Sequence, residues 1–135
     1  RELPDMNVPR FCHACCVMSD GRFAVFGGWH RLSCLPVSDF QNTLTLLSSC
    51  EVLCLDDGDE RWEPLPDMLV PRADDSYDPC QFMCVSLEGC IIIVAIGKNA
   101  SMEVYEEALG VWRRLPCDLP HNNGHLHYGA SCVLV

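Results

Sequence analysis

Thiols and an imidazole are crowded together near the start of the chain, and such groups bind transition metals or act as nucleophiles. The cluster consists of Cys12, His13, Cys15 and Cys16. A zinc site needs four ligands, usually as two separated pairs. The other close cysteine pairs are Cys50/Cys54 and Cys80/Cys84. Residues four apart on a strand share a face, so these pairs more simply line a sheet interior. With no complete ligand set, we expect no metal and no cofactor. Because apolar surroundings raise a thiol pKa, we also expect no catalytic residue.

Three further histidines, His121, His125 and His127, lie near the end of the sequence. His125 and His127 would share one strand face, which suits two metal bonds. No acid or cysteine clearly completes a ligand set, and the neighbouring Asn and Gly residues favour a turn. Asn99-Ala100-Ser101 matches a glycosylation acceptor, which would stay unused in a reducing compartment.

The composition restricts the partners and the compartment. Nineteen acids against nine bases give a net charge of −10, which opposes binding to nucleic acid and to anionic membranes. No apolar run reaches the roughly 18 residues of a membrane span, and no secretion signal is visible. Eleven cysteines, an odd number lying mostly in apolar runs, favour reduced thiols over the alternative of a secreted disulfide scaffold. We therefore expect a cytoplasmic or nuclear location.

Four short sequences recur in the same order along the chain, and such internal repetition indicates a repeat architecture. The pairs are Leu3-Pro4-Asp5-Met6 with Leu65-Pro66-Asp67-Met68, Pro9-Arg10 with Pro71-Arg72, Glu51-Val52 with Glu103-Val104, and Trp62 with Trp112. The two Trp residues are 50 residues apart and the two Pro-Arg pairs are 62 apart. Repeats of this length are typical of arrays and propellers.

Apolar runs between turn residues predict four strands in each repeat. The first repeat is expected to have strands at 11–18, 22–26, 49–55 and 61–64, and the second at 81–87, 90–96, 102–105 and 111–114. Asp20-Gly21 and Glu88-Gly89 stand between consecutive runs, as in hairpins. Residues 126–135 resemble another opening strand, whereas Leu44–Leu47 could form one turn at most within a long loop. No segment has a helical period.

The landmarks of the two repeats resemble the kelch repeat. They are Gly27, Gly28 and Trp62 in the first copy and Gly97, Tyr105 and Trp112 in the second. The second copy departs from the family in having Lys98 after its first glycine. The resemblance implies an all-β fold of kelch-type β-propeller blades in an incomplete ring. It implies blade one at 10–68, blade two at 72–119, the start of a further blade at 120–135 and the end of a preceding one at 1–9.

In kelch propellers one face, built from the loops between strands two and three and between blades, commonly binds ligands. The contact residues that the resemblance implies are Arg10, Trp29, His30, Arg31, Arg72, Lys98 and Asn99. The loop from Trp29 to Ser48 is about 20 residues long, and it is either functional or an unstructured insertion. Arg10 and Arg72 could grip an acidic peptide, or could pair structurally with an acid such as Asp5 or Asp74. The acidic stretch 74–78 is a solvated loop or selects basic partners.

Two function classes follow from the resemblance. The first is a protein–protein interaction module, either a scaffold or the substrate-recognition part of a BTB- or F-box-type ubiquitin-ligase adaptor with cullin-type partners. The alternative is a catalytic kelch-like propeller of the copper oxidase or sugar-acid epimerase type. A copper site would need converging Tyr and His ligands, but Tyr77 and Tyr105 are isolated and only Tyr128 stands beside a histidine. We therefore expect a binding module and no enzyme.

Overall fold

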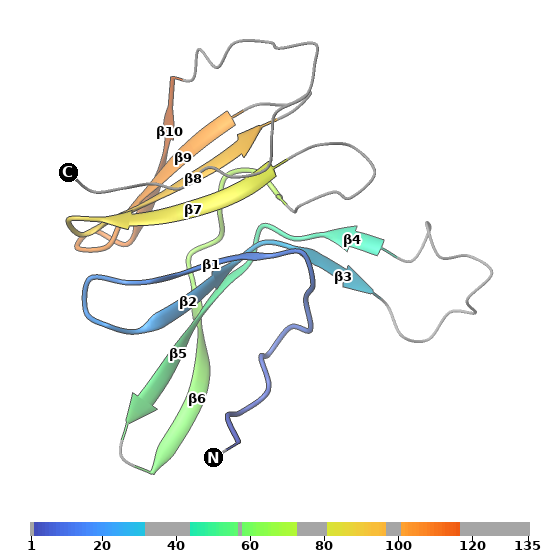
Figure 1. Cartoon of the computed structure of the whole chain (residues 1–135), viewed down its shortest axis with the longest axis vertical. Coiled ribbons are helices and arrows are strands. Elements are labelled where there is room, and N and C mark those ends of the chain that lie inside the picture. Colours follow the sequence, from blue (N-terminus) through green and yellow to red (C-terminus); the bar gives the residue numbers. More distant parts are fainter. Residues whose placement is uncertain (1, 32–43, 57, 73–80, 97–100, 117–135) are drawn as a thin grey trace.

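Two four-stranded antiparallel sheets make up most of the chain, as Figure 1 shows. The computed structural model describes residues 2–31, 44–56, 58–72, 81–96 and 101–116. Within these ranges the chain forms ten strands and no helix. The all-β prediction, with antiparallel four-stranded sheets, is confirmed.

The first sheet, here called blade one, has the strand order β1-β2-β5-β6. Its strands are β1 (Ala14–Val17), β2 (Phe23–Phe26), β5 (Cys50–Asp56) and β6 (Asp59–Leu65). Gly21, with a φ of 88°, allows the turn between β1 and β2, where the Asp20 carboxylate accepts the backbone N–H of Arg22 at 3.0 Å. Ala24, Phe26 and Val52 are almost fully buried, so the two central strands form the apolar centre of this sheet.

The second sheet, blade two, repeats the same plan with the order β10-β9-β8-β7. Its strands are β7 (Gln81–Leu87), β8 (Cys90–Ile96), β9 (Ser101–Glu106) and β10 (Val111–Leu115). Glu88 and Gly89 alone connect β7 to β8, and both have a positive φ, of 46° and 79°. Two consecutive left-handed residues form the tight hairpin turn whose twist matches that of the strands, so the predicted hairpin is confirmed.

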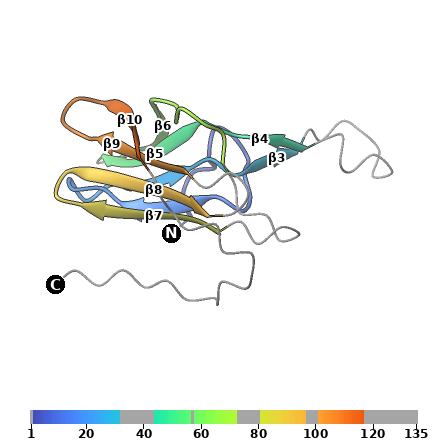
Figure 2. The same ribbon diagram turned by 90° about the horizontal axis from the view of Figure 1, so that it is seen from above.

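A third, two-stranded sheet corrects the prediction of a long loop from Trp29 to Ser48. Strand β3 (Trp29–Arg31) pairs with β4 (Leu44–Leu46), where one turn at most was expected. The hairpin extends away from blade one in both views (Figures 1 and 2). Trp29 lies opposite Leu46, and such aromatic–aliphatic pairs stabilise short antiparallel strands. A strand of three residues is too short to show an alternating pattern in the sequence. Its partner strand is also distant in sequence, so no tight turn marks the pair.

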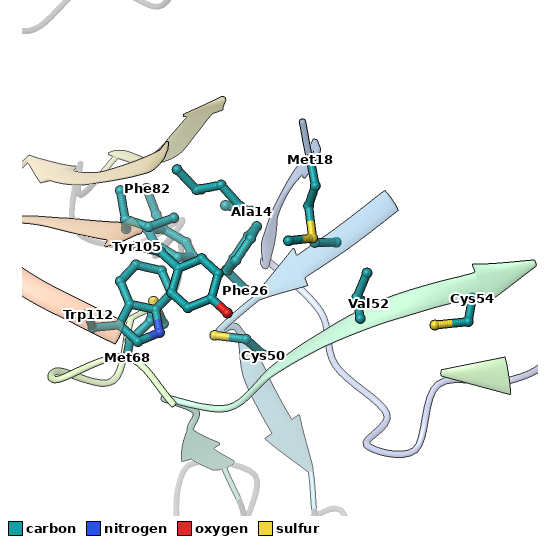
Figure 3. Close-up of a cluster of buried hydrophobic side chains, with 13 residues drawn as sticks. Ala14, Met18, Phe26, Cys50, Val52, Cys54, Met68, Phe82, Tyr105 and Trp112 are labelled. Atoms are coloured by element: carbon teal, nitrogen blue, oxygen red, sulfur yellow. The ribbon is translucent and has the colours of Figure 1, made fainter. Parts of the chain in front are cut away.

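The two blades share one apolar core. Figure 3 shows Tyr105 and Trp112 of blade two pointing toward Phe26 and Met68, which belong to the blade-one side. The ring centroids of Phe26 and Trp112 are 6.0 Å apart at an interplanar angle of 84°, an edge-to-face contact. Cys50 and Cys54 lie in the same core, so the prediction that this pair lines a sheet interior is confirmed. The blades are therefore held together largely by aromatic and aliphatic packing.

The glycine pair at the end of β2 is required by the backbone around it. Gly27 and Gly28 have φ values of 59° and 98°, a region that other residues rarely adopt. A Cβ on Gly27 would lie 2.3 Å from the carbonyl oxygen of Arg72, and the N–H of Gly28 donates to that same oxygen at 2.7 Å. The pair thus lets the inter-blade segment pass directly over the end of blade one.

The two sheets fall within residues 10–68 and 72–119, the ranges expected for the two blades. The expected opening strand at 126–135, and with it the whole range 120–135, lies outside the described residues. Residues 2–9 are described and contain no strand. Among the residues that the structure describes, no helix has the length and apolarity needed to cross a membrane.

Candidate functional site

Arg10, which precedes blade one, points into the protein. Its Nη1 donates to the carbonyl oxygens of Gly27 at 2.9 Å and Ser49 at 2.8 Å. Its Nη2 lies 2.6 Å from Oε1 of Glu51, and both side chains are almost completely buried. The guanidinium group therefore joins the start of blade one to the ends of β2 and β5.

Arg72 occupies the equivalent position before blade two. Its Nη1 donates to the carbonyl oxygen of Ser101 at 2.9 Å, and its Nε donates to Oε2 of Glu103 at 3.1 Å. Only 3% of the Arg72 side chain and none of the Glu103 side chain are exposed. The expectation that Arg10 and Arg72 face a partner is thus corrected, since both form structural ion pairs. The acids are strand residues, not the Asp5 or Asp74 considered from sequence.

The two ion pairs differ in how completely they are satisfied. Glu51 also accepts the backbone N–H groups of Asn7 at 2.8 Å and Val8 at 3.1 Å. In blade one, Nε of Arg10 is buried without a hydrogen-bond partner, whereas in blade two both Oε1 of Glu103 and Nη2 of Arg72 are. A buried polar atom without a partner carries a desolvation cost, so the second pair is the less stabilising of the two.

The two landmark Trp residues occupy equivalent settings. The indole Nε1 of Trp62 donates to the carbonyl oxygen of Pro4 at 2.9 Å, and that of Trp112 donates to Pro66 at 2.7 Å. Pro4 and Pro66 are the same position of the recurring Leu-Pro-Asp-Met sequence. Trp112 is 9% exposed because blade one covers it, whereas Trp62 is half-buried. The sequence repeat is therefore a structural repeat.

An exposed apolar row crosses the base of the β3–β4 hairpin. Trp29 lies opposite Leu46 and, on its other side, forms an isolated bridge with Phe11. Directly opposite residues of antiparallel strands point to the same face, so the three side chains form one row, here called the apolar row. Phe11 is 42% and Leu46 37% exposed, and Trp29 is half-buried. Sequence reasoning selected Trp29 but missed Phe11 and Leu46, because only strand pairing brings them together.

His30 of β3 holds the hairpin against the segment that precedes blade one. Nδ1 of His30 lies 2.8 Å from the carbonyl oxygen of Pro9, which precedes the buried Arg10. Arg31, at the end of β3, is half-buried, and it too makes an interaction within the chain. Lys98 and Asn99, the other expected contact residues, and the landmark Gly97 lie outside the described residues. The candidate surface is therefore the apolar row with its His30 support.

The cysteine–histidine cluster does not converge on a point. Cys15 and Cys16 are consecutive on β1 and so point to opposite faces. Cys12 and Cys15 are exposed, whereas Cys16 is half-buried. The pKa of His13 is lowered by burial and by the nearby Arg10, so its neutral form is favoured. Within the described ranges, no group of three or more His, Cys, Asp or Glu side chains is arranged to hold a metal ion.

Tyr105, the described tyrosine of the copper hypothesis, lies in the core. Its ring centroid is 5.1 Å from that of Trp112, and burial and the Glu107 carboxylate raise its pKa. Tyr77 and Tyr128, like His121, His125, His127 and the acidic stretch 74–78, lie outside the described residues. The described geometry thus gives Tyr105 the role of a packing residue between the blades.

Comparisons with known proteins agree with this architecture. Residues 9–69 match the family model described as the kelch motif. No curated protein matches the chain. A solved structure of a fungal alcohol oxidase of the AA5 family, in complex with copper, is similar with a TM-score of 0.52 and 22% identity. The match covers 78% of this chain but 18% of that chain, so the likeness is one of fold. The motif match supports a kelch-repeat fragment, and the two equivalent four-stranded sheets fit an incomplete propeller.

Proposed function

We propose that this chain is a protein-interaction module that contacts its partner through the apolar row Phe11–Trp29–Leu46. The kelch motif supports an interaction or propeller module in general. The single observation that carries the finer proposal is the exposure of a Trp-centred apolar row on a hairpin that extends beyond both sheets. Trp is among the residues that dominate binding energy at protein interfaces.

Replacing Trp29 by Ala is expected to weaken partner binding by at least about tenfold, because central aromatic residues are typical interface hot spots. The partner is first captured from cells with the intact parent protein, and its affinity for each variant is then measured by calorimetry. Leu46→Asp should have a similar effect, since a carboxylate would interrupt the same row.

Leu109→Asp is the matched control for this experiment. Leu109 is 62% exposed and lies in the turn between β9 and β10, at a different edge of the molecule (Figure 1). The proposal requires this variant to bind as well as the unchanged protein. The proposal is contradicted if Trp29→Ala binds the partner as tightly as the unchanged protein does. It is also contradicted if Leu109→Asp loses as much affinity as Trp29→Ala.

The finer role that we propose for this module is substrate recognition in a BTB- or F-box-type ubiquitin-ligase adaptor, with scaffolding as the alternative role. The proposal includes the cytoplasmic or nuclear location expected from the odd cysteine count. Affinity purification of the intact parent protein distinguishes the roles. Co-purification of cullin-type ligase components supports the adaptor, and capture of a partner without them supports a scaffold.

The competing proposal is a copper-dependent enzyme, and the fold likeness to the alcohol oxidase is the observation that favours it. We expect the purified protein to contain copper well below one atom per chain, since the described tyrosine packs in the core. Elemental analysis after purification and after incubation with copper measures this directly. Retention of stoichiometric copper through dialysis would overturn the binding-module proposal.

A further inference from the structure

Two cysteines lie where the first strands of the two blades pack against each other. Strand β1 carries Cys16 and packs against β7, which carries Cys84 (Figure 1). The thiols of Cys16 and Cys84 interact electrostatically across this contact, and both residues pack against the shared core. Because β1 and β7 belong to separate sheets, this contact is not one of strand pairing.

The two thiols of this junction differ in reactivity. The interaction with Cys84 lowers the pKa of Cys16, whereas the interaction with Cys16, together with burial, raises the pKa of Cys84. Cys16 is half-buried, so small molecules can reach it, and a thiolate is the nucleophile in thiol–disulfide exchange. Burial raises the pKa of the core residue Cys50 to about 12, a shift opposite in direction to that of Cys16. Position and reactivity thus separate Cys16 from the other core cysteines.

We propose that Cys16 and Cys84 form an inter-blade disulfide when the protein meets a low-molecular-weight disulfide such as oxidised glutathione. The Cys16 thiolate attacks one glutathione sulfur, the glutathione S–S bond breaks, and the leaving thiolate takes up the proton that Cys16 lost. The sulfur of Cys84 then gives up its proton and attacks Cys16, and the second glutathione leaves as a thiol. Two protein thiols are oxidised, and one glutathione disulfide is reduced to two thiols.

The bond would change the mechanical coupling of the blades. It closes a chain loop from residue 16 to residue 84, which contains β2, the β3–β4 hairpin, β5 and β6. Cross-linking so long a loop reduces the conformational freedom of the unfolded chain. The disulfide therefore stabilises the docked arrangement of the blades, and reduction by a thiol reverses it.

The test treats the whole chain with oxidised glutathione, blocks free thiols with an alkylating agent, and maps linked tryptic peptides by mass spectrometry. Cleavage after Arg and Lys gives peptides 11–22 and 73–98, which contain Cys16 and Cys84. We expect these two peptides to be linked, with fragment ions that assign the bond to Cys16 and Cys84. The melting temperature should rise by at least about 5 °C on oxidation and return with dithiothreitol.

Three variants control the assignment. Cys16→Ser and Cys84→Ser should abolish the link, whereas Cys15→Ser should retain it, because Cys15 is exposed on the opposite face of β1. The mapping on the unchanged protein does not depend on how well any variant folds. The proposal is overturned if peptides 11–22 and 73–98 stay unlinked, if glutathione remains attached to Cys16 without exchange, or if the link persists in Cys16→Ser.

Discussion

Arg72→Met is expected to lower the free energy of unfolding by about 3–5 kcal/mol, because it leaves the Glu103 carboxylate buried without its charge partner. The Glu103 side chain is fully buried, and its Oε1 already has no hydrogen-bond partner. A small domain has a total stability of only about 5–15 kcal/mol, so the loss is a large share of it. Urea denaturation followed by circular dichroism measures the change.

The double variant Arg72→Met/Glu103→Leu separates the ion pair from mere packing damage. When both charges are replaced by apolar side chains of similar volume, the desolvation cost disappears with the attraction. We therefore expect the double variant to regain at least about half of the stability lost by Arg72→Met. A double variant as unstable as the sum of both single changes would contradict this account of the Arg72–Glu103 pair.

The same double change in blade one gives a matched comparison with the opposite expectation. Glu51 accepts two backbone N–H groups, from Asn7 and Val8, in addition to its bond with Arg10. Arg10→Met/Glu51→Leu removes the acceptor and leaves both donors unpaired, so little stability should return. The contrast between the two pairs tests the observed difference in hydrogen bonding, because their positions in the blades are equivalent.

These ion pairs also show how far the sequence could predict the structure. The recurring turns and apolar runs were sufficient to predict the four-stranded sheets, because local residues such as Glu88 and Gly89 specify each hairpin. The acids that pair with Arg10 and Arg72 lie 41 and 31 residues away, and sequence reasoning favoured nearer carboxylates. One signal was available, since the Pro-Arg and Glu-Val sequences recur together once per repeat.

The contacts that sequence reasoning missed depend on non-local pairing. Phe11 joins Leu46 through Trp29, and Cys16 meets Cys84 only because blade two packs on blade one. Local periodicity describes which face of a strand is apolar, but it does not specify what that face contacts. Sequence reasoning selected Trp29 and His30, and the fold adds Phe11 and Leu46 beside them; their contact with a partner stays a prediction.

Trp112→Ala is expected to destabilise the chain by about 3–5 kcal/mol, because it opens a cavity between the blades. Trp112 contacts Phe26 across the interface and Tyr105 within its own blade, and its indole donates to Pro66 at 2.7 Å. Trp112→Phe keeps much of the packing but loses this donor, so a loss of about 1–2 kcal/mol is expected. Urea denaturation again measures both values.

Trp62→Ala is the matched control, since Trp62 makes the equivalent hydrogen bond to Pro4 but no second blade covers it in the described part of the chain. Its loss should cost about half as much as that of Trp112, because less apolar surface returns to water. The difference between the two variants then measures the contribution of blade-on-blade packing. Equal losses would mean that Trp112 acts within blade two alone, and the shared core would not be what joins the blades.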